Sequence, residues 1–489
     1  MSGLASLLPP IVALVVAAAS RRVLPALALG GITGTVLLAA QDGGWWTAVP
    51  AGLLGFVRLG ILGQAADASH AQMLVLIALI SGFVHLLDAS GSARALIGRL
   101  ANRVRTPAQA QLATWAGGLV LFFSDFGNVL ILGPMFGPLY DRVGLSRERL
   151  AWIIDTTAAP VCVLVPFIAW GVFAAGLIEA ALPGSDGFVV LVSALPYQLY
   201  PWLSLAFVPL MALAGRAFGP MARTVPRTEA LPAAQAASDV SAGPAFAAFL
   251  MLFLTLMVVG ATGIYTDGRV TGEGVRVALG AAYLVAIGVL WAGLGVGADA
   301  LWRGVGNSAP LLGLLLLAWT LGEVCGQLGT GAFLARTLGD ALPAAAVPVA
   351  IFLLGAVMSF ATGTSWGTFA ILMPIGIGLA QQAGVPVAAA VGAVLSGGVF
   401  GDHVSPISDT TLLASAAAET DHGSHVSTQL PLAISVGIAS GAGFIVAGTA
   451  GASAGFAAGL IGLGGVVAAS RVWARVRDMS EEVHKSRLE

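Results

Sequence analysis

The stretch Gly401-Asp402-His403-Val404-Ser405-Pro406-Ile407-Ser408-Asp409-Thr410-Thr411 lies between two strongly apolar segments and decides the fold. Only 9% of the residues in the chain are charged, so the carboxylates of Asp402 and Asp409 between apolar segments indicate a functional role. A charge near the centre of a bilayer costs about 2.5 to 3.5 kcal/mol, and intramembrane acids usually mark an ion, proton or substrate site. Pro406 and Gly401 interrupt a helix and free backbone carbonyls, which membranes tolerate only beside a cavity or neighbouring protein. The stretch therefore predicts a broken transmembrane helix.

The composition predicts an all-α polytopic membrane protein whose main partner is the lipid bilayer. Hydrophobic residues make up 57% of the 489 residues, the mean hydropathy is +0.92, and apolar runs recur along the whole chain. The net charge of −2 argues against a nucleic-acid partner. Cys162 and Cys325 lie in apolar segments without metal-ligand spacing, so we expect buried thiols.

Apolar segments of about 20 residues predict membrane spans. Eleven are expected, near residues 5–19, 23–40, 71–88, 149–180, 188–215, 244–264, 277–296, 308–326, 386–416, 429–449 and 453–470. Two further apolar stretches, 109–140 and 344–380, carry polar residues at their middles. At about 1.5 Å per residue each is too short to cross twice with a turn, so each predicts a re-entrant helical hairpin.

The basic residues predict the orientation of the chain. With the N-terminus outside, the inner segments collect all basic residues except Arg58, Arg269, Arg276 and Arg336. We therefore expect a multi-pass protein of the cytoplasmic (inner) membrane with a cytoplasmic C-terminus. The expected organisation is N-terminal scaffold helices 1–70, a first repeat 71–215, a cytoplasmic linker 216–243, scaffold helices 244–307, a second repeat 308–450, and a last helix with a cytoplasmic tail 451–489.

An internal repeat underlies this organisation. The string 124–128, Ser-Asp-Phe-Gly-Asn, aligns with 364–368, Thr-Ser-Trp-Gly-Thr, at an offset of 240 that also relates Pro134 to Pro374. A broken helix is expected after each hairpin, at 155–160 and at 401–411. Because the first copy starts out-to-in and the second in-to-out, the copies are predicted to be inverted. Paired discontinuous helices in inverted repeats indicate a substrate and coupling-ion site near the midplane.

Three strings of the sequence are informative together: 155–163 (Asp-Thr-Thr-Ala-Ala-Pro-Val-Cys-Val), 361–368 (Ala-Thr-Gly-Thr-Ser-Trp-Gly-Thr) and 401–411. They resemble the NhaC-type Na+/H+ antiporter family of the ion transporter superfamily. The resemblance implies an elevator-type transporter, often a homodimer, in which a transport domain of hairpins and broken helices slides against a scaffold. The family's first hairpin commonly carries two adjacent acids, whereas here Ser124 precedes a single Asp125.

Sodium prefers oxygen ligands, which carboxylates, hydroxyls, amides and unwound carbonyls supply. Asp155 and Asp409 are favoured as the carboxylates that hold sodium or a proton, because each precedes a Thr-Thr pair beside a helix break. The Na+ candidates are Asp155, Asp409, Asn128 and Thr410. The full set of candidate cation-, proton- or substrate-binding residues is Asp125, Asn128, Asp155, Thr156, Thr157, Thr364, Ser365, Thr368, Asp402, Ser405, Asp409, Thr410 and Thr411.

Structural roles compete with these assignments. Asp402 could pair with His403 across the helix break, Asp125 could cap a helix, and Asp155 could lie at the inner interface. Any single hydroxyl could bond its own backbone. Asp88, at the end of the third span, is expected at the interface rather than in a proton path.

Three functions from different classes are open. The leading one is antiport of Na+ against H+. The alternative is a Na+- or H+-coupled carrier or exchanger of a small organic anion or amino acid. A channel or a membrane enzyme is disfavoured, because broken repeats indicate alternating access and only His403 beside Asp402 offers a catalytic pair. We expect no catalytic residue and no cofactor apart from transported Na+.

Overall fold

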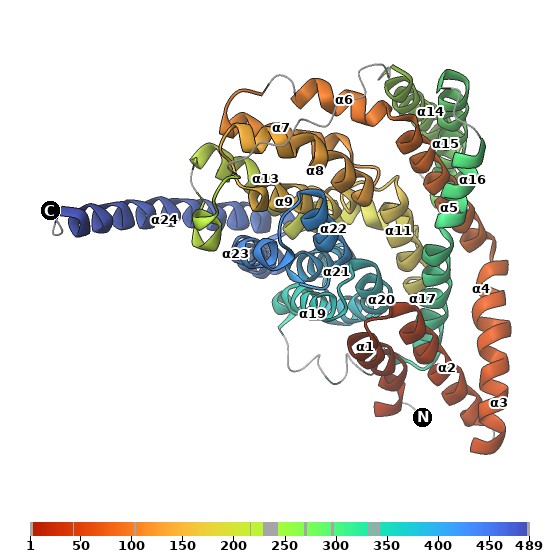
Figure 1. Cartoon of the computed structure of the whole chain (residues 1–489). Coiled ribbons are helices and arrows are strands. Elements are labelled where there is room, and N and C mark those ends of the chain that lie inside the picture. Colours follow the sequence, from red (N-terminus) through yellow and green to blue (C-terminus); the bar gives the residue numbers. More distant parts are fainter. Residues whose placement is uncertain are drawn as a thin grey trace.

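The computed structural model describes residues 3–42, 44–101, 104–215, 217–227, 243–267, 271–294, 298–330, 333, 337 and 343–486, and within them every regular element is a helix (Figure 1). Ten helices in these ranges are long and apolar enough to cross a membrane. The predicted all-α polytopic architecture is confirmed. Most of the predicted linker 216–243 lies outside the described residues.

The N-terminal region contains a helix that the sequence analysis did not predict. After η1 (Leu4–Leu7), α1 (Leu8–Ser20) and α2 (Val23–Asp42), the chain continues through α3 (Trp45–Gly55), η2 (Phe56–Leu62) and α4 (Gly63–Ala66). Residues 46–66 are apolar enough to span a membrane, although no span was expected there. Glycines lower the hydropathy of this segment, but they serve close packing: a Cβ on Gly60 would lie 2.6 Å from Thr320 Cγ2.

The first repeat forms a hairpin followed by an interrupted helix. Its elements are α5 (Ala68–Ser90), α6 (Ser92–Ala101), the hairpin α7 (Pro107–Val120) and α8 (Asp125–Arg142), the interrupted helix α9 (Arg147–Thr156), α10 (Ala159–Cys162) and α11 (Ala169–Ala181), and then α12 (Gly187–Ala194), η3 (Leu195–Tyr197), α13 (Leu199–Ala214) and η4 (Gly219–Arg223). The predicted hairpin is present, and its entry from one side of the membrane stays a prediction.

The second half of the chain also contains a hairpin followed by an interrupted helix. After α14 (Gly243–Asp267), α15 (Gly272–Leu294) and α16 (Ala298–Asn307) come α17 (Ala309–Gln327), η5 (Ala344–Ala346), the hairpin α19 (Val347–Thr362) and α20 (Ser365–Ala383), the interrupted helix α21 (Val387–Val404) and α22 (Asp409–Ala417), α23 (His422–Ala450) and α24 (Ala452–Ser486). Gly363 turns this hairpin with φ +69°, and a Cβ there would lie 2.6 Å from Ile407 O. Glycine suits both demands.

The predicted offset of 240 extends to the helix boundaries. It relates the first residues of α7 and α19, of α8 and α20, of α9 and α21, and of α11 and α22. The two breaks differ, because α9 ends at Thr156 whereas α21 continues to Val404. Asp155 therefore aligns with Leu395 and not with Asp402 or Asp409. The two copies therefore share their helix boundaries, but their acidic residues are at positions that do not correspond.

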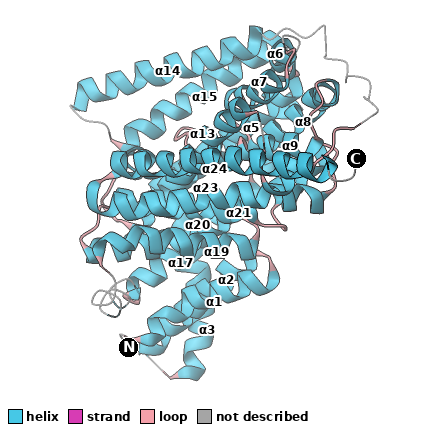
Figure 2. Cartoon of the chain, turned by 90° about the vertical axis from the view of Figure 1, so that its left-hand side faces the viewer, coloured by secondary structure: helices cyan, strands magenta, loops and turns pink. Residues whose placement is uncertain are grey.

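Helices of the two repeats interlock. In Figure 1, α22 lies beside α8 and α9, and α21 lies beside α19 and α20. Gly133 of α8 faces Ala417 at the end of α22 so closely that a Cβ would meet the Ala417 carbonyl oxygen. On the other side, α2, α5, α15, α16 and α17 form a second group (Figure 1). In Figure 2, α23 and α24 run side by side across the hairpin group.

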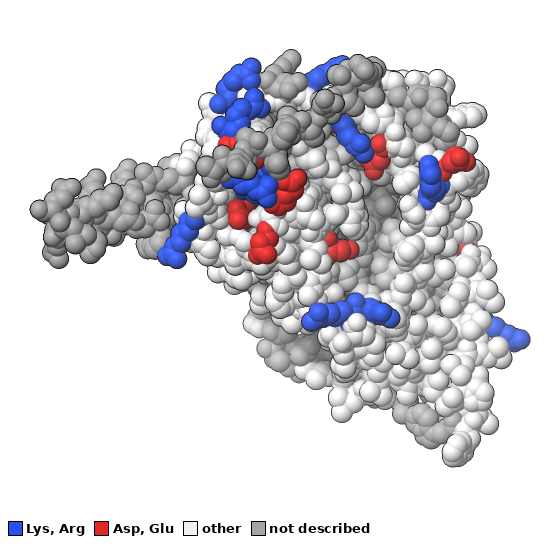
Figure 3. All heavy atoms as spheres, viewed as in Figure 1, with Lys and Arg blue, Asp and Glu red and all other residues white. Residues whose placement is uncertain are grey.

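Charged side chains are sparse on the surface. In the view of Figure 3 most of them gather over the upper part of the molecule, and wide areas below carry none. Large exposed hydrophobic side chains are frequent, among them Leu213, Ile438 and Ile461. A surface of this kind suits contact with lipid.

Candidate functional site

A cavity of about 870 Å³ lies between the hairpin tips and the second helix group. One wall comes from the first residues of four helices, α8, α11, α20 and α22; the other comes from α2, α5, α16 and α17. The residues named here line it: Ser124, Asp125, Phe126, Trp170, Thr364, Trp366 and Asp409 on the first wall, and Val23, Ile80, Asp88, Asn307 and Leu311 on the second. Both repeats thus contribute to one cavity.

Asp125 presents a free carboxylate oxygen at this cavity. Ser124 is the N-cap of α8, since its hydroxyl accepts a hydrogen bond from the Gly127 N–H (2.9 Å). Asp125 is 7% exposed, and its Oδ1 accepts from the Phe126 N–H (2.9 Å). Its buried Oδ2 has no hydrogen-bond partner among the described residues. Ser124 thus makes the cap that was considered as an alternative role for Asp125, which leaves the acid available to a ligand.

Asp88 lies at the same place, and its expected position at the membrane interface stays a prediction. It lines the cavity, and a Cβ on Gly127 would lie 3.3 Å from Asp88 Oδ2. Its Oδ1 is buried and, in the described part of the chain, unpartnered. Asp409, the first residue of α22, is close enough to Asp125 for the two charges to repel. Three carboxylates therefore face one cavity.

Asp402 bonds the second hairpin and does not pair with His403. Its Oδ2 accepts hydrogen bonds from the Ser365 hydroxyl (2.7 Å) and the Ser365 N–H (3.3 Å) at the start of α20. The His403 ring instead contacts the Tyr200 hydroxyl (Nδ1, 2.6 Å) and the Thr156 hydroxyl (Nε2, 3.3 Å). Neighbouring residues on a helix point in different directions, which explains why the alternative of an Asp402–His403 pair is wrong.

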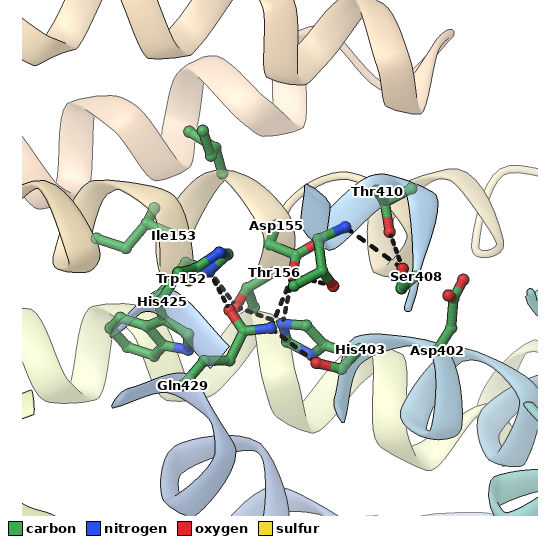
Figure 4. A network of polar contacts seen from close by, with 12 residues as sticks. Trp152, Ile153, Asp155, Thr156, Asp402, His403, Ser408, Thr410, His425 and Gln429 are labelled. Carbon is green, nitrogen blue, oxygen red and sulfur yellow. Dashed lines mark hydrogen bonds and ion pairs between the residues drawn. The ribbon is translucent and has the colours of Figure 1, made fainter. Parts of the chain in front are cut away.

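Asp155 is the centre of a buried polar network (Figure 4). Its side chain is 2% exposed, and the alternative of a position at the inner membrane interface stays a prediction. Asp155 Oδ2 accepts from the Gln429 amide (2.7 Å) and from the Thr411 hydroxyl (2.9 Å). His403 Nε2 lies 3.9 Å from the same oxygen. The acid of the first repeat is thus held by both parts of the broken helix of the second.

The network continues along α23 toward the surface. Gln429 also donates to the His403 carbonyl (2.7 Å), and its Oε1 lies 2.8 Å from His425 Nε2. His425 Nδ1 is 2.8 Å from the Ser415 hydroxyl, which is 3.0 Å from His422 Nδ1. His422 is only partly buried. A line of titratable and hydroxyl groups therefore runs from the protein surface to the neighbourhood of Asp155.

The other predicted ligands form mainly backbone contacts. Asn128 donates through its amide nitrogen to the Gly118 and Thr157 carbonyls (2.9 and 2.8 Å), and its buried Oδ1 has no partner among the described residues. Hydroxyl groups that donate to a backbone carbonyl are those of Thr156, Thr157, Thr368 and Ser405. Thr410 shares a hydrogen bond with Ser408 (2.9 Å).

The structure therefore divides the predicted residues into two groups. Asp125, Asp409 and Thr364 line the cavity, whereas Asp155, Thr156 and Thr411 belong to the buried network; α22 contributes to both. The four Na+ candidates are not gathered in one cage. In the ranges that the structure describes, no three His, Cys, Asp or Glu side chains are grouped to hold a metal ion.

The residues that sequence reasoning missed are on α23 and α13. Gln429, His425 and Tyr200 all contribute to the Asp155 network. The predicted span began at 429 and left the histidines in a loop. The spacing of His422, His425 and Gln429 places all three on one helical face, and that spacing was the available signal.

Comparison with known proteins decides the family. The model of the Na+/H+ antiporter family matches residues 3–180 and 161–449 of this chain. The chain belongs to the Na+/H+ antiporter family. The resemblance to NhaC-type antiporters is thereby confirmed, and the protein is a secondary transporter of the antiporter class with a multi-pass helical architecture.

The chain is also similar to individual relatives and to one solved structure. An uncharacterized protein of Haemophilus influenzae is 30% identical over 492 residues, which cover 94% of this chain and 93% of the relative. The malate-2H(+)/Na(+)-lactate antiporter of Bacillus subtilis is 42% identical over 86 residues, 18% of either chain. The crystal structure of the Alcanivorax borkumensis YdaH transporter has a similar fold, with a TM-score of 0.62, 16% identity, and coverage of 91% of this chain and 98% of that one.

Proposed function

We propose that this antiporter exchanges Na+ for H+ and that the Asp155 carboxylate holds one or the other. The observation that carries the proposal is the burial of this acid among neutral hydrogen-bond donors, the Gln429 amide and the Thr411 hydroxyl. A buried carboxylate without a fixed counter-charge is stable when it takes up one positive charge. A proton and a sodium ion both supply it, and they exclude each other.

Competition for one acid couples the two fluxes. When Na+ arrives, the proton has to leave, and the His425–Ser415–His422 line, which reaches Asp155 through Gln429, offers groups that can accept it. Oxygen atoms for the ion are near: the Thr411 hydroxyl, which bonds Asp155, and the Thr156 hydroxyl, which contacts the same His403 nitrogen as Asp155 does. Hydroxyl oxygens suit a hard cation.

We further propose an elevator motion in a homodimer of the cytoplasmic membrane, with the N-terminus outside. The position of the cavity supports the motion, because it separates the hairpins and broken helices from α2, α5, α16 and α17. The distribution of basic residues along the sequence supports the orientation. In this mechanism the first group carries the ion past the second, which stays fixed.

Proton flux in proteoliposomes tests the exchange. With an acidic lumen and a pH-sensitive dye inside, external NaCl is expected to raise the luminal pH at least fivefold faster than KCl at the same ionic strength. Sodium entry through the protein drives the proton out. Empty liposomes provide the control for leak. Equal rates with NaCl, LiCl and KCl would contradict Na+/H+ exchange.

A reversible cross-link tests the sliding motion. A Cβ on Gly367 of α20 would lie 3.1 Å from the Val23 Cβ of α2, close to the separation of about 3.5 to 4.5 Å in a disulfide. In a background that lacks Cys162 and Cys325, oxidation of Gly367→Cys/Val23→Cys is expected to lower the exchange rate at least tenfold, and reduction to restore it. The pair Gly82→Cys/Val305→Cys joins α5 and α16, which both belong to the group that stays fixed, and is the control. Unchanged exchange in fully cross-linked Gly367→Cys/Val23→Cys would exclude sliding here.

Exchange of an organic solute is the second candidate function. The cavity volume of about 870 Å³ favours it, because pockets for small organic molecules measure roughly 300 to 1,000 Å³. The Bacillus subtilis relative is named as an antiporter of malate and lactate with protons and sodium. An ion at Asp155 and a solute in the cavity are compatible, since different side chains serve them.

A further inference from the structure

The wall of the cavity suits an organic body better than a bare ion. Four aromatic side chains line it: Phe123, Phe126, Trp170 and Trp366. The Trp170 and Trp366 rings are in contact, with centroids 4.4 Å apart. The Phe173 ring packs edge-on against the Trp366 ring, with centroids 4.9 Å apart. Hard cations such as sodium take oxygen ligands, which these rings do not provide. Rings fixed in this way form a binding surface for an apolar or aromatic group.

The charge of the cavity is negative. Asp88, Asp125 and Asp409 face it, whereas its basic groups are Arg22, exposed at the start of α2, and the imidazole of His85. Asp125 is 7% exposed and has a free Oδ2, and Asp88 has a free Oδ1. Unpartnered buried acceptors are costly, so each of these oxygens requires a donor or a cation.

Aromatic and acidic side chains lie together in the manner of an ammonium site. Trp170 is beside the Asp125 carboxylate and in contact with Trp366. A cation over an indole face gains about 0.5 to 2 kcal/mol, more when it is desolvated. An ammonium group that binds the Asp125 carboxylate and contacts a ring face of the Trp170–Trp366 pair would receive both contributions.

The helix ends at the cavity do not favour an anion. Helix N-termini attract negative charge, but three of the four that meet here already have a carboxylate of the protein: Asp125 at α8, Asp409 at α22, and Asp402 on the Ser365 N–H of α20. An anionic solute would be placed beside these acids.

We propose that the cavity binds an organic cation, an ammonium group on an aromatic or aliphatic body, as the solute exchanged against the ion at Asp155. This inference rests on the proposed function of the Asp155 network. Helix α22 connects the two places, since Asp409 faces the cavity and Thr411, two residues later, bonds Asp155. A cation beside Asp409 therefore repels a positive charge at Asp155, so the two places are not favourably occupied at the same time. Antiport requires such mutually exclusive binding.

Calorimetric titration of the purified full-length protein tests the proposal. The probes are benzylammonium, benzyltrimethylammonium and putrescine, compared with the anion 3-phenylpropionate and the zwitterion phenylalanine. At least one of the three cations is expected to bind tenfold or more tightly than either comparison compound. Asp125→Asn is expected to weaken that binding at least tenfold. Trp366→Leu should weaken it by about fivefold, whereas Trp366→Phe retains most of it and Trp46→Leu, 96% exposed, changes nothing.

Two outcomes would overturn the proposal. One is that none of the three cations binds more tightly than 3-phenylpropionate and phenylalanine. The other is that Trp366→Leu binds the cation as the wild type does. The Trp366 variants keep the test decisive if Asp125→Asn does not fold, which size-exclusion chromatography would show.

The failures of the two proposals are distinguishable. Sodium-driven proton flux without binding of any of the three cations would overturn the organic-cation site and leave Na+/H+ exchange standing. Binding with the expected dependence on Asp125 and Trp366, but without sodium-driven proton flux, would overturn Na+/H+ exchange and support the organic-cation site.

Discussion

Asp155→Asn is expected to abolish sodium-driven proton flux, with a rate at least 100-fold below that of the wild type. Asparagine has the same shape and can still accept from Thr411 through its amide oxygen, but it cannot release a proton or offer a negative charge to sodium. The hydrogen bonds to Gln429 and Thr411 position this group without titrating themselves. The measurement is the dye assay in proteoliposomes, on protein that elutes as a single species.

A matched variant separates the role of this acid from a general effect of the substitution. Asp421 is an exposed N-cap of α23 whose Oδ2 accepts from the Ser424 N–H (2.8 Å), a bond that asparagine can also accept. Asp421→Asn is therefore expected to transport at the wild-type rate. If Asp155→Asn keeps half or more of the wild-type flux, Asp155 is not the ion carrier, and Asp402 becomes the first alternative.

Arg147→Met is expected to destabilise the protein strongly, by about 3 to 5 kcal/mol, which is the cost of leaving one member of a buried ion pair alone. Arg147 is 4% exposed and binds Asp141 with two hydrogen bonds, Nε to Oδ1 (2.9 Å) and Nη2 to Oδ2 (2.8 Å). Its Nη1 also donates to the Ala418 carbonyl just after α22 (3.3 Å). Its loss would leave the Asp141 charge buried and unpaired.

The measurement is the yield and thermal midpoint of a fluorescent fusion by size-exclusion chromatography. The double variant Arg147→Met/Asp141→Asn should recover part of the loss, because the buried charge is gone as well. Arg147→Lys should be intermediate, since one ammonium cannot replace a planar two-bond contact. Exposed Arg303→Met is the control. Equal stability of Arg147→Met and Arg303→Met would show that the ion pair contributes little.

The sequence contains most of the architecture because the bilayer restricts the choices. Spans, hairpins and interrupted helices follow from runs of apolar residues and from the polar residues that interrupt them, and the 240-residue offset follows from matching strings at the two tips. The helix at 46–66 was missed because glycine and Arg58 reduce its hydropathy. Close packing of Gly52 against Val36 and of Gly60 against Thr320 depends on tertiary contacts that hydropathy does not contain.

The candidate site was harder to predict, because its parts are far apart along the chain. The breaks pointed to Asp155, Asp402 and Asp409, but not to their partners. Gln429 is 274 residues from Asp155, and only the packing of α23 on α9 brings them together. Asp88 resembled an interfacial acid because it ends an apolar run; its place beside Gly127 follows from the position of the hairpin tip.

The repeat has one further consequence, for the symmetry of the transport cycle. At the first residues of α8 and α20 the chain has Asp125 and Ser365, and at those of α11 and α22 it has Ala169 and Asp409, so each equivalent pair has one acid and one neutral residue. In the proposed inverted arrangement, two identical copies would surround the cargo in the same way on both sides of the membrane. In this chain the two repeats can swap their backbone conformations during the cycle. The acids do not occupy equivalent positions in the two repeats, so the electric field around the cargo differs between the two states. Binding affinity can therefore differ between the two faces of the membrane, and a preferred direction of release can be encoded in two side chains.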